Sequence, residues 1–415
     1  MTATTSAALT SFLIEDARER PGDDPIFFLN AEAQRRARAG ERIINATLGA
    51  LVEDDGILAI LPSVGEAISR VKLVDAASYA PIAGEPGFLS AVIRDLYHGR
   101  AQGERSVAVA TPGGTGALHH AIVNFLDPGE ALLTTKYYWG PYKTIADHTR
   151  RRVETFEMFD AAGRFDTKSF QVALERQVET QKRALVILNT PCHNPTGYSL
   201  DAREWAGVCE ALRHASLTAP VSLCVDYAYA HFGGRSEKWL EQVETLGERV
   251  LLLCAWTASK SFAQYGARIG ALVASHSDAS ERTRIHNALS YSCRGTWSNC
   301  NHLGMLAIAD LMNSPESSLR IDAERQRLVD LLGARVQAFN AAARASGLKY
   351  PRYEGGFFVT VFSKDPQAEA KHMRENGVYV VPIAGALRVA LCSTPVSAVP
   401  ELVRALAAAQ AACGG

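Results

Sequence analysis

No apolar run in the sequence approaches the roughly 18 residues that a membrane-spanning helix needs. Residues 1–24 also lack a basic segment followed by an apolar stretch, so no secretion signal is indicated. An excess of one charge is missing as well: 43 Lys and Arg residues stand against 44 Asp and Glu, which leaves a net charge of -1. Attraction to nucleic acid or to an anionic membrane surface is therefore not expected. We expect a cytoplasmic protein whose partners are small molecules.

Cysteine pairs with the spacing of a metal site or of a C-x-x-C motif are absent. The eight cysteines are Cys192, Cys209, Cys224, Cys254, Cys293, Cys300, Cys392 and Cys413. Several of them lie inside apolar runs, which favours buried, reduced thiols over disulfides. We expect no metal site at these positions.

Apolar residues are plentiful enough for a large core, since 47% of the 415 residues are hydrophobic. Short apolar runs of β character alternate with longer helical stretches through the middle of the chain. The predicted strands are residues 107–110, 131–135, 184–189, 221–226 and 250–255. This alternation predicts an α/β fold with a mostly parallel sheet flanked by helices. Ligands bind outside the carboxyl ends of such strands, so the loops there form the candidate site.

The pattern changes after residue 314. A charged helical pattern at 315–346 leads into three strand-like runs at 356–362, 378–383 and 387–392, and the alanine-rich tail at 396–413 predicts a surface helix. Near the N-terminus, residues 24–40 predict a helix, and residues 43–51 lead from it toward the large lobe. We therefore predict a large ligand-binding domain at 48–314 and a smaller α+β domain made of residues 1–47 and 315–415.

A lysine stands just past the predicted strand 250–255, in Thr257-Ala258-Ser259-Lys260-Ser261-Phe262. At a strand end Lys260 can face a ligand, and its neutral amine attacks an aldehyde once burial or nearby positive charge lowers its pKa. Arg268 follows eight residues later and can serve the same site. A solvated surface lysine is the competing interpretation.

Two other predicted strands run into polar residues. The turn His193-Asn194-Pro195-Thr196-Gly197 follows the strand 184–189, where Asn194 can direct its amide at a ligand, although the same residues fit a plain turn. Asp226 ends the strand 221–226. A buried carboxylate there would keep a pyridine nitrogen protonated and make the ring a better electron sink. An aspartate that caps the following segment fits the local sequence equally well.

A glycine-rich loop follows the strand 107–110, in Thr111-Pro112-Gly113-Gly114-Thr115-Gly116-Ala117-Leu118. Glycines let backbone N–H groups approach a phosphate, and the N-terminus of a following helix adds favourable partial charge. The spacing differs from G-x-G-x-x-G, so a dinucleotide site is not indicated. A glycine-rich turn without a ligand is the alternative.

Taken in order, these motifs resemble the fold-type I, class I aminotransferases, particularly the aspartate and aromatic aminotransferase subgroup. The ordered set is Tyr79-x-x-x-x-Gly84-x-Pro86-Gly87, Gly113-Gly114-Thr115-Gly116-Ala117-Leu118, Trp139, His193-Asn194-Pro195-Thr196-Gly197, Asp226-x-x-Tyr229, Ser259-Lys260-Ser261-Phe262-x-x-Tyr265-Gly266-x-Arg268-x-Gly270-Ala271, Ser298-Asn299 and Arg388. Each motif alone is modest, but the ordered set is specific and extends from about residue 24 to the C-terminus. The resemblance implies a mostly parallel seven-stranded sheet, pyridoxal 5'-phosphate as cofactor, and a homodimer with shared active sites.

The resemblance also implies roles for individual residues. Lys260 would hold the cofactor as a Schiff base and later move a proton, and Asp226 and Tyr229 would be the other catalytic residues. The implied cofactor contacts are Gly114, Thr115, Trp139, Asn194, Asp226, Tyr229, Thr257, Ser259, Lys260 and Arg268, together with Tyr79 of the neighbouring subunit.

Substrate contacts follow from the same resemblance. Arg388 is a charge inside the apolar run 387–391, and a substrate α-carboxylate would satisfy it, with an internal salt bridge as the alternative. Arg294 stands where dicarboxylate-specific members bind the distal carboxylate across the dimer interface. Aspartate or glutamate is therefore favoured, and aromatic substrates remain possible. The other implied substrate contacts are Gly49, Asn194 and Trp139.

Several residues depart from the family pattern. Tyr142 stands where many members have a histidine near Asp226, Cys300-Asn301 replaces a proline pair, and Thr47 replaces a glycine in the segment over the substrate. These changes concern the pocket and not the cofactor chemistry. Two other functions stay open: a pyridoxal-phosphate enzyme of the same fold that performs elimination, replacement or cyclisation, and a non-catalytic binding protein that has kept the fold.

Overall fold

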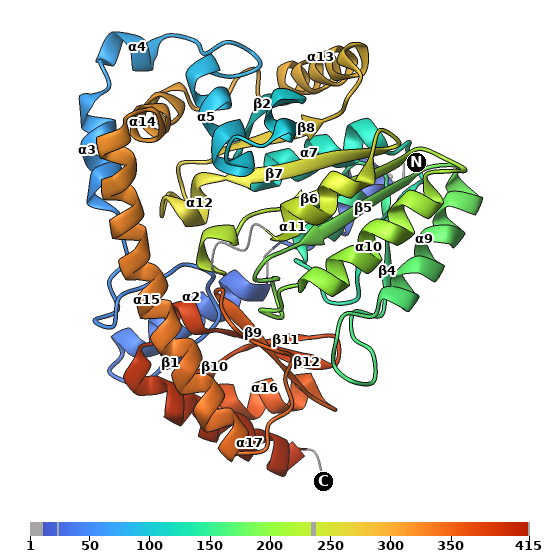
Figure 1. Cartoon of the computed structure of the whole chain (residues 1–415). Coiled ribbons are helices and arrows are strands. Elements are labelled where there is room, and N and C mark those ends of the chain that lie inside the picture. The colour runs from blue at the N-terminus through green and yellow to red at the C-terminus, as the bar shows by residue number, and fades with distance from the viewer. Residues whose placement is uncertain (1–10, 23–24, 234–237, 414–415) are drawn as a thin grey trace, which may run out of the picture.

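The computed structural model describes residues 11–22, 25–233 and 238–413. Residues 1–10 lie outside the described residues. So does Asp24, with which the predicted N-terminal helix begins. Figure 1 shows two lobes, with the long helix α15 (Pro315–Ala345) running from one to the other. None of the helices in the described part of the chain is both long and apolar enough to cross a membrane.

The upper lobe contains a seven-stranded sheet (Figure 1). Its order across the sheet is β2 (Ser106–Pro112), β8 (Ile269–Ser275), β7 (Val250–Thr257), β6 (Val221–Asp226), β5 (Ala184–Asn189), β3 (Ala131–Thr135) and β4 (Arg152–Phe156). Only β8 runs antiparallel to its neighbours. The predicted α/β fold with a mostly parallel seven-stranded sheet is confirmed.

Helices on both faces explain why the central strands are apolar along their whole length. Every residue of β3, β5 and β6 is buried, because neither face of the sheet meets water. The helices of this lobe are α3 (Pro62–Arg70), α4 (Leu73–Ala77), α5 (Pro86–Tyr97), α6 (Ala101–Glu104), α7 (Gly113–Phe125), α8 (Pro141–His148), α9 (Thr167–Gln181), α10 (Ala202–Ala215), α11 (Lys238–Val243), α12 (Ala258–Ser261), α13 (Ala279–Thr296) and α14 (His302–Asn313), with the 3-10 turns η1 (Ala230–Phe232) and η2 (Glu244–Leu246).

The lower lobe combines both ends of the chain. A three-stranded antiparallel sheet has the order β11 (Val381–Ile383), β12 (Ala386–Ala390) and β9 (Phe358–Phe362). Near it, β1 (Ile44–Asn45) pairs in parallel with β10 (Val378–Tyr379). The remaining elements are α1 (Glu15–Arg18), α2 (Pro25–Arg38), α16 (Pro366–Glu375), the 3-10 turns η3 (Leu391–Ser393) and η4 (Val396–Ala398), and α17 (Val399–Cys413). The β1–β10 pairing is compatible with the predicted division at 47/48 and 314/315, which stays a prediction.

The predicted strands at 378–383 and 387–392 were wrong in extent. Residues 378–383 form two strands, β10 and β11, which belong to different sheets. Pro382 has no N–H to donate, and β11 accommodates it at the edge of its sheet. The run 387–392 also ends early, because β12 stops at Ala390 and η3 follows.

Two strands of the large sheet were missed. β4 carries charged residues and lies at the sheet edge, so its sequence lacks an apolar run. β8 begins with Ile269-Gly270 and is buried throughout. Because glycine is uncommon inside strands, this start did not indicate a strand in the sequence.

Close packing of β8 against the glycine-rich loop gives the first testable prediction. A Cβ added at Gly270 would come within 2.6 Å of the backbone carbonyl carbon of Gly113. We expect Gly270→Ala to lower the free energy of unfolding by about 1–3 kcal/mol, because backbone must move to admit the methyl group. Urea unfolding measures this. Gly266→Ala is the matched control, since nothing lies within 4 Å of its added Cβ; equal stability of the two variants would contradict the packing argument.

Candidate functional site

A cavity of about 290 Å³ lies at the carboxyl ends of β5, β6 and β7. Its lining residues are Phe27, Gly114, Thr115, Leu118, Trp139, Asn189, Asn194, Asp226, Ala228, Tyr229, Thr257, Ser259, Lys260 and Arg268. Every predicted cofactor contact except Tyr79 is in this set. Residues that are far apart in the sequence therefore meet in one place.

Lys260 lies on α12, the short helix that begins directly after β7. Its Nζ lies 4.9 Å from the centre of the Tyr265 ring and 5.8 Å from that of Tyr229. Burial, with a smaller effect from the positive charge of Arg268, lowers the pKa of Lys260 to about 8, although Cys392 and Asp226 act in the opposite direction. A substantial fraction of this amine is therefore neutral near physiological pH, as a nucleophile toward an aldehyde requires.

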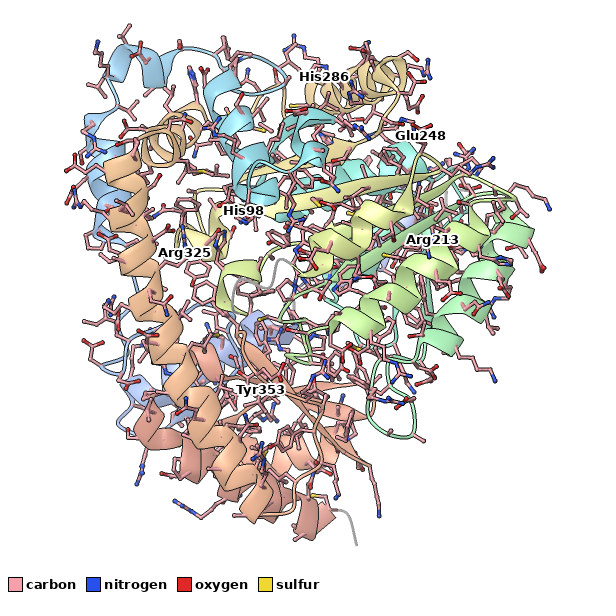
Figure 2. All side chains as sticks on the ribbon, in the orientation of Figure 1. His98, Arg213, Glu248, His286, Arg325 and Tyr353 are labelled. Atoms are coloured by element: carbon pink, nitrogen blue, oxygen red, sulfur yellow. The ribbon has the colours of Figure 1, made fainter. Side chains whose placement is uncertain are left out.

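The long helix α15, which joins the two lobes (Figure 1), supports α12. Arg325, labelled on α15 in Figure 2, donates its Nε to the carbonyl oxygen of Ser261 at 2.8 Å. Its guanidinium lies 5.1 Å from the centre of the Phe262 ring. These two contacts hold the C-terminal end of α12 in place.

Asp226 is the last residue of β6 and is buried. Burial raises the pKa of its carboxyl to about 6, and hydrogen bonds from Tyr142 and the backbone at Ala228 work against that rise. The Tyr142 hydroxyl donates to Oδ2 at 2.7 Å. A cation at the cavity would favour the ionised carboxylate, which fits a protonated ring nitrogen.

Asn194 and Tyr229 meet on another wall of the cavity. The Nδ2 group of Asn194 donates to the Tyr229 hydroxyl at 3.2 Å. Both groups can also reach an oxygen of a ligand, and burial keeps Tyr229 protonated by raising its pKa far above the ordinary value of 10.0. The turn that carries Asn194 is held by the small lobe, since Thr360 on β9 donates to the carbonyl oxygen of Pro195 at 2.9 Å.

Hydrogen-bond donors converge at the other end of the cavity. Gly114 and Thr115 stand in the first turn of α7, whose backbone N–H groups have no partner within the helix. Arg268 approaches Thr115 Oγ1 and Ser259 Oγ, both at 3.4 Å. Gly113 must be glycine here, because its φ is +70° and an added Cβ would lie 2.6 Å from the Arg268 guanidinium. This concentration of donors fits a phosphate group.

Arg388 is buried on β12, behind the ring of Phe358. Its guanidinium lies 4.6 Å from the centre of that ring, and Nη2 donates to the carbonyl oxygen of Thr47 at 2.5 Å. Gly49 also lies against Phe358, since an added Cβ would be 2.6 Å from the ring. The predicted substrate contacts Arg388 and Gly49 thus border the same phenylalanine, which also packs against Tyr229.

Four predicted site residues do not line this cavity: Arg388 and Gly49, which border Phe358, and Tyr79 and Arg294. Tyr79 is 91% exposed, and Arg294 is exposed on α13, where Nη1 donates to Ser298 at 2.5 Å. Both were predicted to act across a dimer interface, and that prediction stays open.

Sequence reasoning missed Asn189 and Phe27. Asn189 ends β5 and is buried; its Nδ2 donates to the carbonyl oxygen of Asp226 at 2.9 Å, and its Oδ1 accepts from the Asn194 N–H at 2.6 Å. Its position as the polar last residue of a buried strand was the available signal. Phe27, on α2, reaches the cavity from the N-terminal segment. No local motif marks it.

The residues around the cavity fit the predicted cofactor. Pyridoxal phosphate needs an amine for its aldehyde, an acid for its ring nitrogen and donors for its phosphate. Lys260, Asp226 and the Arg268–Ser259–Thr115 group offer these at one cavity. A cluster of three or more His, Cys, Asp or Glu residues suited to a metal ion is not present among the described residues.

Comparisons with known proteins agree with this arrangement. Residues 42–406 match the family model described as aminotransferase class I and II. The chain is 28% identical to the tyrosine aminotransferase of Klebsiella pneumoniae, over 88% of this chain and 93% of that protein. It is 26% identical to the aspartate aminotransferase of Pseudomonas aeruginosa, over 86% and 90% of the two chains.

Solved structures show the same fold. An aminotransferase from Anaerococcus prevotii DSM 20548 superposes with a TM-score of 0.91 at 31% identity, covering 96% of this chain and 99% of that one. An aromatic-amino-acid aminotransferase from Burkholderia pseudomallei, covalently bound to pyridoxal phosphate, gives a TM-score of 0.79 at 24% identity, with 95% and 98% coverage.

The lowered pKa of Lys260 predicts how the cofactor-free protein captures pyridoxal phosphate. The rate should rise with pH and level off above about 8, where the amine is already neutral. An unperturbed lysine would continue to gain rate toward its ordinary pKa of 10.5. Stopped-flow absorbance measures the rate; N-acetyl-lysine amide corrects for titration of the aldehyde reagent, and Lys260→Ala is the blank. A rate that still climbs steeply beyond pH 9 would contradict a perturbed Lys260.

Proposed function

This chain belongs to the aminotransferase class I and II family, and from that premise we propose that it transfers an amino group between an L-amino acid and a 2-oxo acid. Lys260 would hold pyridoxal phosphate, and the two half-reactions would follow each other in a ping-pong order. The observation that carries the proposal is the single buried cavity that Lys260 and Asp226 both line.

Each residue at the cavity then has a task. Pyridoxal phosphate supplies an electron-withdrawing ring that stabilises negative charge at the substrate's α-carbon. The Nζ of Lys260 removes the α-proton and returns it, which suits an amine whose pKa is about 8. Asp226 would keep the ring nitrogen protonated, and the hydroxyl of Tyr229 and the amide of Asn194 would donate to the ring oxygen. Trp139 would stack on the ring.

Arginines would select the substrate. Arg388 would bind the α-carboxylate, a task for which a guanidinium is suited by its two parallel N–H donors. Arg294 of the partner subunit would bind a distal carboxylate, which favours aspartate or glutamate. Relatives named as aromatic-amino-acid and as aspartate aminotransferases support both substrate classes. Elimination, replacement or cyclisation at the same cofactor is the alternative.

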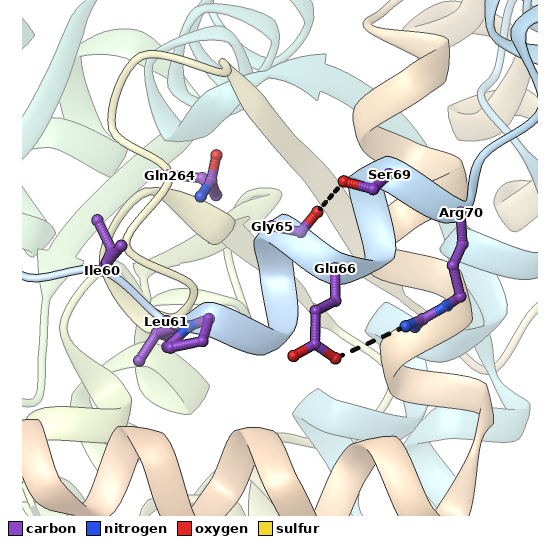
Figure 3. A pocket seen from close by; sticks show the side chains of 8 residues that line it. Ile60, Leu61, Gly65, Glu66, Ser69, Arg70 and Gln264 are labelled. Carbon is purple, nitrogen blue, oxygen red and sulfur yellow. Dashed lines mark hydrogen bonds and ion pairs between the residues drawn. The ribbon is translucent and has the colours of Figure 1, made fainter.

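Exposed apolar residues support a dimer. Ile57, Ile60, Leu73, Val74 and Tyr79 are all more than half exposed, within a segment of fewer than thirty residues. Beside Ile60 a groove of about 710 Å³ runs along α3 (Figure 3) and shares no lining residue with the cavity at Lys260. An apolar surface of this kind is typical of a subunit interface. We propose a homodimer in which this surface is covered.

A donor screen tests the substrate assignment. Arg294→Ala should reduce single-turnover conversion of the bound cofactor to its amino form about 30-fold or more with aspartate and glutamate, because the distal carboxylate loses its ionic partner. Conversion with phenylalanine and tyrosine should change little. Arg284→Ala is the matched control, since Arg284 lies on the same helix and pairs only with Glu281 among the ion pairs found in the described residues.

Two outcomes would contradict these assignments. An unchanged donor profile in Arg294→Ala removes the distal-carboxylate role. Failure of the wild-type protein to form the amino cofactor with any amino acid in the screen removes transamination itself and leaves the alternative reaction types.

Mixing two inactive variants tests the shared site. If Tyr79 serves the partner's cavity, Tyr79→Ala and Lys260→Ala subunits that have been unfolded and refolded together should recover about a quarter of the wild-type activity, because half of the dimers carry one intact site. The separately refolded variants are the controls. No recovery, in a mixture that light scattering shows to be dimeric, would place Tyr79 outside the partner's site.

A further inference from the structure

Tyr142 is the residue near the cavity whose role the proposed function leaves open. It is fully buried on α8, only 1% exposed, and does not line the cavity. Its hydroxyl donates to Asp226 Oδ2 at 2.7 Å. A phenol buried in this way usually needs a hydrogen-bond partner, and here the partner is the carboxylate proposed to face the cofactor's ring nitrogen.

The same short segment also forms a wall of the cavity. The N–H of Tyr142 donates to the carbonyl oxygen of Trp139 at 2.9 Å, which closes a tight turn at the start of α8. The two rings pack edge to face, with centres 5.9 Å apart and planes at 90°. Trp139 lines the cavity, so Tyr142 contacts two proposed cofactor residues at once.

Several other groups also contact Asp226 or act on its charge. Asn189 donates to the backbone carbonyl of Asp226, and both its side chain and the backbone at Ala228 also hydrogen-bond the carboxylate. Lys260 acts on the carboxylate through its charge, while Tyr229 and Cys224 lie within electrostatic range. Of the hydrogen bonds to the carboxylate, the one from Tyr142 lowers its pKa most, ahead of those from the backbone at Ala228 and the side chain of Asn189.

We propose that Tyr142 is a positioning residue: its hydroxyl fixes the Asp226 carboxylate and keeps it ionised, so that the other oxygen faces the ring nitrogen of pyridoxal phosphate. This inference rests on the proposed function, because it presumes that Asp226 holds that nitrogen. A phenol suits the task, since burial and the charge of Asp226 raise the pKa of Tyr142 well above 10.0. The donor therefore keeps its proton at every pH at which the protein works.

The cofactor-free protein gives the first test. The pKa of Asp226 in the folded protein, about 6, exceeds the ordinary value of 3.8, so its contribution to stability is present at low pH and is lost as pH rises through about 6. Tyr142→Phe keeps the ring against Trp139 and removes the donor. We expect the pH at which this loss of stability is complete to rise by about one unit. Without the hydrogen bond from Tyr142, the folded protein holds the Asp226 proton to a higher pH. Urea unfolding between about pH 5 and 8 measures it, and Asp226→Asn supplies the background to subtract.

Affinity for pyridoxal phosphate gives the second test. Tyr142→Phe should weaken binding of the cofactor by about tenfold near pH 5 and progressively less toward pH 8. At the lower pH the Asp226 carboxyl, without its hydrogen bond from Tyr142, is more often protonated. In the Asp226→Asn background the same substitution should leave affinity nearly unchanged. Tyr138→Phe is the matched control, because this neighbouring ring stacks on Tyr142 and has no hydrogen bond to Asp226 in the described structure.

The outcomes separate the two claims. If Asp226→Asn alone leaves affinity unchanged, the assigned role of Asp226 in the proposed function is wrong. Asp226→Asn could weaken cofactor binding while Tyr142→Phe changes neither the pH dependence of stability nor the affinity. Tyr142 would then be a buried residue without a positioning role, and the inference fails. If Tyr142→Phe lowers cofactor affinity equally at every pH in both the wild-type and the Asp226→Asn protein, Tyr142 acts through packing alone, and the inference also fails.

Discussion

An amine and a carboxyl group with opposite needs share one buried cavity, and the rest of the structure depends on that constraint. In the proposed function, Lys260 must lose its charge to react, whereas Asp226 must keep its charge to hold a cation. Burial favours the neutral form of both. Hydrogen bonds to Asp226 from neighbouring elements partly offset the effect for the carboxylate. The amine has no such support among the described residues, where its contacts are two aromatic rings and no hydrogen-bond acceptor.

Strand register brings these groups together. Asn189, Asp226 and Ala255 stand opposite one another across β5, β6 and β7. Because the strands are parallel, their carboxyl ends and the loops that follow open on one side of the sheet. The turn with Asn194, the segment with Tyr229 and the helix with Lys260 therefore meet without any long excursion of the chain. Asn189 links two of these segments through its amide.

The smaller lobe completes the site from the other side. β12 supplies Arg388, β9 supplies the Phe358 ring beside it, and Thr360 holds the turn that carries Asn194. Segments 47–49 and 385–390 lie together because β1 and β10 pair and because Arg388 donates to Thr47. In the proposed function, a substrate bound between Arg388 and Lys260 would thus contact both lobes.

The sequence by itself determined the fold class, the strands at 131–135, 184–189 and 221–226, and the family, because buried parallel strands are apolar throughout and the motifs at their ends are specific in order. It also placed Lys260, Asp226, Asn194 and Arg268 in one candidate site. Only the tertiary structure decided that Asn189 and Phe27 reach the cavity, that Tyr142 bonds Asp226, and that residues 378–383 divide between two sheets. These features depend on contacts between segments far apart in the chain, and no local pattern of residues encodes such contacts.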